Sequence, residues 1–320
     1  MWETTMRIEQ SATVHAEPSR LWSLLSSPAA WSLWPDSAFM FAVPEAQRLR
    51  FFIGPTRRGT GVVLYEVSDE VPGSMIRLRT LPAGRQEFTL SVAAGRRGTA
   101  KAAVRVAEPV PRLRLMGFEV KRRNDLKAWL SAVRGVVEGR SQWPGVDMPA
   151  GRWLQCMVRP RITNAQDASA SALIDADPAT VWEAVHSPET ARIVGSSRPI
   201  YSGHVPGTPQ GEAGEMQYFV SRRANGQLTG SVVVVTEISW QRSALAHDLG
   251  PIQGETRYLL TPECDSGPTR LEITHRWPAK LTNDAEAARS GIAQWMQATV
   301  SDYKSLIETG DGRASAATDS

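Results

Sequence analysis

Three polar side chains in the C-terminal half of the chain have the type and setting of an acid–base or ligand-anchoring group. His275 belongs to the alternating segment LEITHRW, whose odd-numbered residues would share one face of a strand. Tyr258 lies in a second strand-like segment, ETRYLLTPE, and Tyr303 lies in an amphipathic helix pattern. Histidine exchanges a proton near neutral pH, and tyrosine joins an apolar ring to a polar hydroxyl. His275 is therefore interpreted either as a general acid/base or ligand anchor, or as a hydrogen-bonded histidine of the core.

Common catalytic and metal-binding motifs are missing from the sequence. It contains no G-x-S-x-G, H-E-x-x-H, P-loop or G-x-G-x-x-G pattern, and its five histidines lack metal-ligand spacing. Cys156 and Cys264 form no C-x-x-C pair, so neither a disulfide framework nor a zinc site is expected. No metal and no cofactor are predicted. The lack of a Rieske cysteine–histidine pair excludes a ring-hydroxylating oxygenase subunit.

The elements that would position these residues occur twice. Residues 11–28, SATVHAEPSRLWSLLSSP, match residues 171–188, SALIDADPATVWEAVHSP, at seven of eighteen positions without a gap. An offset of 160 in a chain of 320 residues indicates one domain built twice. We predict a first domain over 1–138, a linker over 139–167, a second domain over 168–309 and a disordered tail over 310–320.

Each copy has the same predicted order of elements. A short strand precedes a helix that begins near Pro18 or Pro178, and Asp177 is a good N-cap. Consecutive strand-like segments follow at 60–68, 74–80, 86–94 and 99–107, and again at 215–223, 227–240, 255–263 and 269–277. With no helix between them, these strands should form an antiparallel sheet. A long amphipathic helix closes each copy, and we align the two helices by matching Trp129 with Trp295.

This order resembles the START/SRPBCC superfamily, the helix-grip fold of polyketide cyclase/dehydrase and lipid-transport proteins. The resemblance rests on A-x-P-x-x-x-W-x-x-x-x-S-P in both copies, on the late strand pair YLLTPECDSGPTRLEITHRWP and on the terminal helix. It covers nearly all of both copies. It implies an α+β chain of two tandem helix-grip units, each with a curved antiparallel sheet around a C-terminal helix. The fold does not decide the function.

The resemblance implies an apolar cavity between each sheet and its terminal helix. We expect its walls, and hence the ligand contacts, to come mainly from aromatic and polar residues of both copies. The candidates are Trp182, Tyr218, Tyr258, His275, Trp277, Trp295, Thr299 and Tyr303 in the second copy, with Trp22, Phe88 and Trp129 in the first. The segment WSLWP at 31–35 occurs in the first copy alone and is interpreted as a lid or as packing.

The two copies differ in predicted polarity. We align His275, Tyr258 and Tyr303 with Val106, Phe88 and Val137, which makes the second cavity the more polar one. Residues 1–160 carry 23 Lys and Arg against 14 Asp and Glu, whereas residues 161–320 carry 13 against 19. The net charges of +9 and −6 are interpreted as drift between duplicated copies, as attraction between the two copies or between two chains in a homodimer, or as a basic surface for an anionic partner or membrane. We expect the working cavity in the second copy.

Three functions remain open from the sequence. The first is binding or carriage of a hydrophobic small molecule, such as a lipid or polyketide-like compound. The second is an aromatase/cyclase-like enzyme acting on a poly-β-ketone, with His275 and Tyr258 as its catalytic residues. The third is a non-catalytic protein-interaction module. No signal peptide and no apolar run of membrane-spanning length is found, so a cytoplasmic protein without nucleic-acid binding or membrane insertion is expected.

Overall fold

The computed structural model describes residues 3–43, 50–56, 61–81, 86–111, 115–142, 165–195, 198–249, 254–264, 267–278 and 285–310. The chain divides into two compact units, the first unit and the second unit. Most of the predicted linker, the tail beyond residue 310, and Cys156 lie outside the described residues. The predicted domain boundaries therefore stay predictions.

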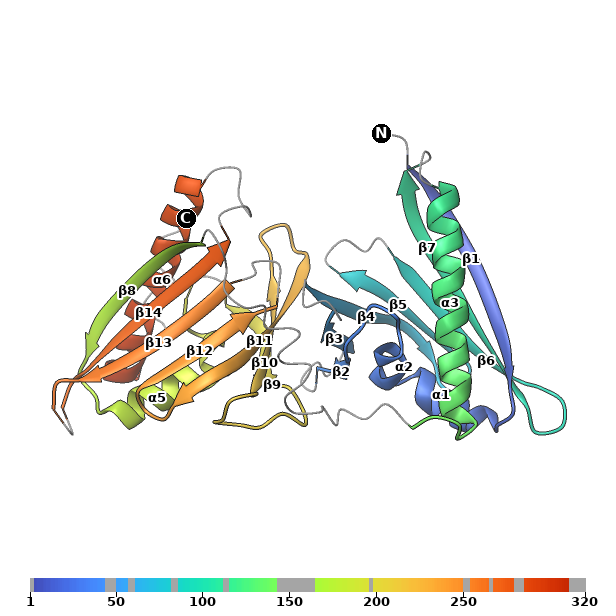
Figure 1. Cartoon of the computed structure of the whole chain (residues 1–320), viewed down its shortest axis with the longest axis horizontal. Helices are drawn as coiled ribbons and strands as arrows, with labels where there is room; N and C mark the ends of the chain where they lie inside the picture. The colour runs from blue at the N-terminus through green and yellow to red at the C-terminus, as the bar shows by residue number, and fades with distance from the viewer. Residues whose placement is uncertain are drawn as a thin grey trace. The chain divides into compact units, whose positions relative to one another are not determined.

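The first unit is a seven-stranded antiparallel sheet with three helices (Figure 1). Its strands lie in the order β1-β7-β6-β5-β4-β3-β2, and the long helix α3 runs along one face of this sheet. The bounds are β1 Glu3–Val14, α1 Pro18–Leu25, α2 Pro28–Ser32, β2 Phe41–Ala42, β3 Phe51–Pro55, β4 Val62–Val71, β5 Met75–Leu81, β6 Glu87–Ala94, β7 Ala100–Pro111 and α3 Leu115–Val137.

The second unit repeats this topology, with sheet order β8-β14-β13-β12-β11-β10-β9 and the closing helix α6 against it. The bounds are β8 Ala165–Ile174, α5 Pro178–His186, the 3₁₀ turn η2 Thr190–Arg192, β9 Pro199–His204, β10 Met216–Arg222, β11 Leu228–Ser239, β12 Ser243–Asp248, β13 Gly254–Pro262, β14 Thr269–Pro278 and α6 Ala285–Thr309. The predicted α+β architecture of two tandem helix-grip units is thus confirmed.

Four strands of the two sheets were not predicted: β2, β3, β9 and β12. The residues of β12, SALAHD, include two alanines and an aspartate, which have low strand propensity. In β9, Gly203 interrupts the pattern because the ring of Tyr218 packs on it. A Cβ at Gly203 would lie 2.9 Å from the Tyr218 hydroxyl oxygen. β9 and β12 are therefore held in the sheet mainly by hydrogen bonds from neighbouring strands, whereas Phe51, Phe52 and Ile53 of β3 are themselves strand-forming residues.

Strand register gives a structural alignment of the two units. Val14 of β1 pairs with Ala100, and the matching Ile174 of β8 pairs with Thr269, so the last strands align at an offset of 169. His275 is therefore equivalent to Val106, as predicted. Across the next ladder Val106 pairs with Phe88, whereas His275 pairs with Thr256.

The predicted match of Phe88 with Tyr258 is therefore wrong by two residues. Phe88 is equivalent to Thr256, and Tyr258 is equivalent to Leu90. A shift of two residues keeps a side chain on the same face of a strand, so alternation alone could not detect the error.

The terminal helices align through a pair of equivalent hydrogen bonds. The backbone N–H of His15 donates to Glu138 Oε1 at 2.9 Å, and that of the equivalent Asp175 donates to Glu308 Oε1 at 2.8 Å. The helices thus align at an offset of 170, which makes Trp129 equivalent to Thr299.

The predicted matches of Trp129 with Trp295 and of Val137 with Tyr303 are therefore wrong by one helical turn. Tyr303 is equivalent to Val133, because the same offset of 170 applies along the whole helix. A shift of four residues returns nearly to the same helix face. The buried face of each helix was therefore predicted correctly, but the residue-by-residue alignment of the two helices was not.

Candidate functional site

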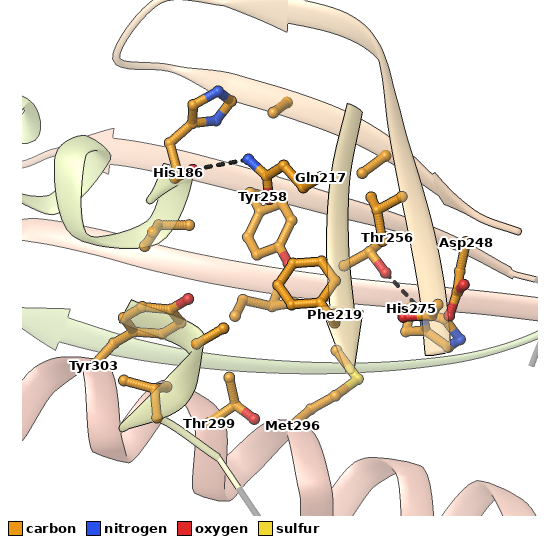
Figure 2. Close-up of a pocket in the computed structure, with 18 of the residues that line it drawn as sticks. His186, Gln217, Phe219, Asp248, Thr256, Tyr258, His275, Met296, Thr299 and Tyr303 are labelled. Atoms are coloured by element: carbon orange, nitrogen blue, oxygen red, sulfur yellow. Dashed lines mark hydrogen bonds between the residues drawn. The ribbon is translucent and has the colours of Figure 1, made fainter. Parts of the chain in front are cut away.

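The second unit encloses a cavity of about 300 Å³ between its sheet and the helices α5 and α6. Its wall is mainly apolar, with valine, alanine and aromatic side chains from β10 to β14 and from both helices. A few polar groups interrupt this wall. Figure 2 shows Gln217, Asp248, Thr256, Tyr258, His275, Thr299 and Tyr303 around it.

Six of the predicted ligand contacts line this cavity, namely Trp182, Tyr258, His275, Trp295, Thr299 and Tyr303. Tyr218 and Trp277 do not line it, although both are buried in the same unit. Tyr218 packs on Gly203, and Trp277 stacks on His275 with ring centroids 5.8 Å apart. Both were expected to contact the ligand, and the structure places both outside the cavity lining.

The three candidates from the first unit lie in a filled core. Phe88 and Trp129 are fully buried, and Trp22 packs half-buried against the same core. Trp31, Trp34 and Tyr65 join Phe88 and Trp129 in a cluster whose ring centroids lie 4.7–6.2 Å apart. The Trp129 indole N–H donates to the carbonyl oxygen of Ala30 at 2.6 Å. Of the two roles considered for WSLWP, the structure confirms packing.

The cavity of the second unit occupies the place of this aromatic cluster. Continued without a gap past Pro28 and Pro188, the alignment of the repeat sets Trp31 and Trp34 against Ala191 and Val194, and strand and helix register supply the other three positions. The residues at the positions of Trp31, Trp34, Tyr65, Phe88 and Trp129 are Ala191, Val194, Val233, Thr256 and Thr299, respectively. All five of these smaller residues line the cavity. The cavity therefore exists because five rings have been replaced by short side chains.

Two tyrosine hydroxyls are available inside the cavity. Tyr258 projects from β13 and Tyr303 from α6, and Tyr303 is only 5% exposed. Neither hydroxyl makes a hydrogen bond with any residue that the structure describes. Burial raises the pKa of Tyr258 to about 12, with a further contribution from the charge of Asp248. Burial also raises the pKa of Tyr303, so both phenols stay neutral at physiological pH.

His275 is held on the cavity wall by a short polar contact. Its Nδ1 lies 2.9 Å from Thr256 Oγ1, and its ring packs so closely on Gly254 that a Cβ there would lie 2.6 Å from Cε1. Burial lowers the pKa of His275 to about 4. At neutral pH the imidazole is therefore uncharged, and only on the order of 0.1% of it is protonated.

A buried polar network beside the cavity was missed from the sequence. The fully buried Glu215 carboxylate accepts from Gly211 N at 2.7 Å and from Gln217 Nε2 at 2.6 Å, and His186 Nε2 lies 2.8 Å from it. Burial alone would raise the pKa of Glu215, but these hydrogen bonds outweigh it and lower the pKa. Because Gln217 Nε2 also donates to the carbonyl oxygen of His186 at 2.9 Å, the network fixes a side chain of the cavity wall.

Part of this network carried no sequence signal. Glu215 and Gln217 flank Met216 in a strand that reads as apolar, and His186 ends a helix far from them in the chain. Thr256 could have been found, because it lies two residues before Tyr258 and so shares its face.

Comparison with known proteins finds similar solved structures but no similar sequence. No family model and no characterised protein sequence matches the chain. Among solved structures, the di-domain ARO/CYC BexL from the BE-7585A biosynthetic pathway matches with 14% identity over 95% of this chain and 99% of its own, at a TM-score of 0.37.

Two further solved structures show the same level of likeness. The di-domain ARO/CYC StfQ from the steffimycin pathway has 10% identity over 94% of this chain and 97% of its own, at a TM-score of 0.37. The Zhui aromatase/cyclase from Streptomyces has 15% identity over 43% of this chain and 96% of its own, at a TM-score of 0.36. At this level of similarity, the matches say nothing about what the cavity binds.

Two features are absent from the part of the chain that the structure describes. No helix among the described residues is long and apolar enough to cross a membrane. Within the same residues, no group of three or more histidine, cysteine, aspartate or glutamate side chains has a geometry that could hold a metal ion.

Proposed function

We propose that this protein binds or carries a hydrophobic small molecule in the cavity of its second unit. The observation that supports the proposal is the replacement of five packed rings by Ala191, Val194, Val233, Thr256 and Thr299. A core that had merely drifted would be expected to refill such a space, since unfilled apolar volume destabilises a domain. A mainly apolar wall with a few polar groups is typical of small-molecule sites.

The aromatase/cyclase alternative is supported by one observation, that Tyr258 and His275 line the same cavity. Enolisation of a ketone requires a base whose pKa lies near the working pH. An imidazole with a pKa of about 4 is a weak base, and it is almost never protonated to act as an acid. We therefore favour binding, with His275 as part of the wall. A purely protein-interacting role would leave the cavity without a purpose.

A plug placed in the cavity tests the proposal. Thr299→Trp restores the ring that Trp129 supplies in the first unit, and Ser301→Trp adds the same ring at an exposed position of α6 as the matched control. Binding of the neutral fluorophore N-phenyl-1-naphthylamine would be titrated by its emission. We expect Thr299→Trp to weaken binding at least tenfold and Ser301→Trp to leave it unchanged.

Two results would overturn the proposal. One is that the unmodified protein fails to bind N-phenyl-1-naphthylamine and other apolar probes, and carries no small molecule in native mass spectrometry. The other is that Thr299→Trp, shown to be folded by circular dichroism, binds the probe as tightly as the unmodified protein.

A further inference from the structure

The described side chains that line the cavity of the second unit include no permanent cation. Among the described residues that line it, none is lysine or arginine, and Asp248 supplies a carboxylate. His275, which also lines it, is kept neutral by burial. A ligand carboxylate inside this wall would therefore lose its hydration without gaining a lysine or arginine as partner, and His186, the other histidine of the wall, already lies 2.8 Å from the Glu215 carboxylate. This loss of hydration opposes binding of an anion.

The cavity offers neutral hydrogen-bond donors in place of cations. The hydroxyls of Tyr258 and Tyr303 come from opposite walls, the sheet and the terminal helix (Figure 2). Tyr303 is more than nine-tenths buried, and neither hydroxyl has a partner among the described residues. Neither hydroxyl oxygen is among the described side-chain atoms that are fully buried without a partner, so both face the open space of the cavity, where an acceptor atom of a ligand can reach them.

The two tyrosines line one cavity, Tyr258 from the sheet and Tyr303 from α6 (Figure 2). In the first unit the equivalent residues are Leu90 and Val133, both buried in the apolar core. The two donors therefore occur only where the cavity is open.

We infer that the ligand of the second unit is an uncharged molecule, mainly apolar, whose carbonyl or ether oxygen accepts a hydrogen bond from Tyr258 or Tyr303. This inference rests on the proposed function, and it adds a selection against carboxylic acids of the same shape. Free fatty acids and other apolar anions are thus excluded as preferred ligands. Tyr258 and Tyr303 determine specificity, and the apolar wall supplies most of the affinity.

Three probes of one shape separate these contributions. The ketone 2-acetylnaphthalene, the anion 2-naphthoate and the hydrocarbon 2-ethylnaphthalene would be titrated into the full chain at pH 7 by displacement of N-phenyl-1-naphthylamine. We expect the ketone to bind at least tenfold more tightly than the anion. Tyr258→Phe and Tyr303→Phe together should weaken ketone binding about fivefold to fiftyfold and leave hydrocarbon binding within twofold.

Tyr201→Phe, on β9 outside the cavity, is the matched control and should change none of the three affinities. The inference is overturned if 2-naphthoate binds as tightly as the ketone, or if the double variant retains full ketone affinity. In both cases the probes still bind and the proposed function survives. If none of the three probes binds, the proposed function and the inference fall together.

Discussion

Thr299 occupies the position in the second unit that Trp129 occupies in the first. Each lies 9 residues before a glutamate, Glu308 or Glu138, that accepts a hydrogen bond from the backbone N–H just after the first strand of its unit. Trp129 closes a cluster of five aromatic rings, whereas Thr299 turns its hydroxyl back to the carbonyl oxygen of Trp295 at 2.8 Å. This position is one of the five at which a ring of the first unit is replaced by a short side chain of the cavity wall in the second. The two copies of one fold have become a filled unit and a unit with a cavity.

Emptying the filled core should cost the first unit much of its stability. Trp129→Thr removes a buried indole and its hydrogen bond to Ala30, and the surrounding rings cannot collapse fully into the space. We expect a loss of about 3–5 kcal/mol in the free energy of unfolding, measured by denaturant titration. Thr299→Ser, at the equivalent position of the second unit, is the control and should cost less than about 1 kcal/mol. A loss below about 1 kcal/mol for Trp129→Thr would contradict the filled core.

The sequence predicted the fold well because the repeat and the periodicity carry it. Alternation identified the faces of β13 and β14, and helical spacing identified the buried stripe of α6, so Tyr258, His275 and Tyr303 were placed on the cavity side. Periodicity fixes a face but not a register. Errors of two residues in a strand and four in a helix therefore stayed hidden until hydrogen bonds between segments far apart in the chain were known.

The cavity itself could not be predicted from single residues. Ala191, Val194 and Thr299 are common residue types that by themselves predict no cavity. They indicate one only when they are compared with the aromatic residues at the equivalent positions of the first unit. The pairing of Trp129 with Trp295 concealed this contrast, because it matched two tryptophans that occupy different turns. The network around Glu215 was missed for a related reason: its members come together only through the fold.

Glu215 should be needed for the stability of the second unit. It is fully buried and is surrounded by His186, Gln217 and the N–H of Gly211. Glu215→Gln removes the charge that these donors stabilise and leaves at least one of them facing another donor. We expect a loss of about 2–4 kcal/mol at pH 7, measured by thermal or denaturant unfolding. Glu212→Gln, an exposed residue of the same loop, is the control and should have little effect.

The lowered pKa of Glu215 also gives this loss a pH dependence. A carboxyl whose pKa is lower in the folded state contributes stability above its ordinary pKa, and this contribution is lost as the pH falls through the folded value. The difference between Glu215→Gln and the unmodified protein should therefore shrink below about pH 4. A difference that stays constant from pH 7 to pH 3 would show that the carboxylate charge is not what the network stabilises.

Glu308 should hold the end of α6 to the strand β8. Its Oε1 accepts from the backbone N–H of Asp175 and from Lys304 Nζ, each at 2.8 Å. Glu308→Ala should lower the free energy of unfolding by about 1 kcal/mol and speed hydrogen exchange at the amide of Asp175. Glu286→Ala, at the exposed start of the same helix, is the control. An unchanged rate of hydrogen exchange at the amide of Asp175 in Glu308→Ala would show that Glu308 does not hold α6 to β8.

His275 should weaken the second unit as the pH falls from about 6.5 to about 4. Burial lowers the pKa of His275 from 6.5 to about 4, so in this window the unfolded chain takes up a proton that the folded chain excludes. Stability is therefore lost with acidification, by on the order of 3 kcal/mol at pH 4 and below. His275→Val introduces the side chain found at the equivalent Val106. It should remove this contribution to the pH dependence of the unfolding free energy, although it also removes the contact with Thr256. His15→Gln, at an exposed histidine, is the control for removal of one imidazole. Unfolding free energies between pH 7.5 and pH 4 would decide the matter: parallel curves for His275→Val and the unmodified protein would mean that His275 is not held neutral by the fold.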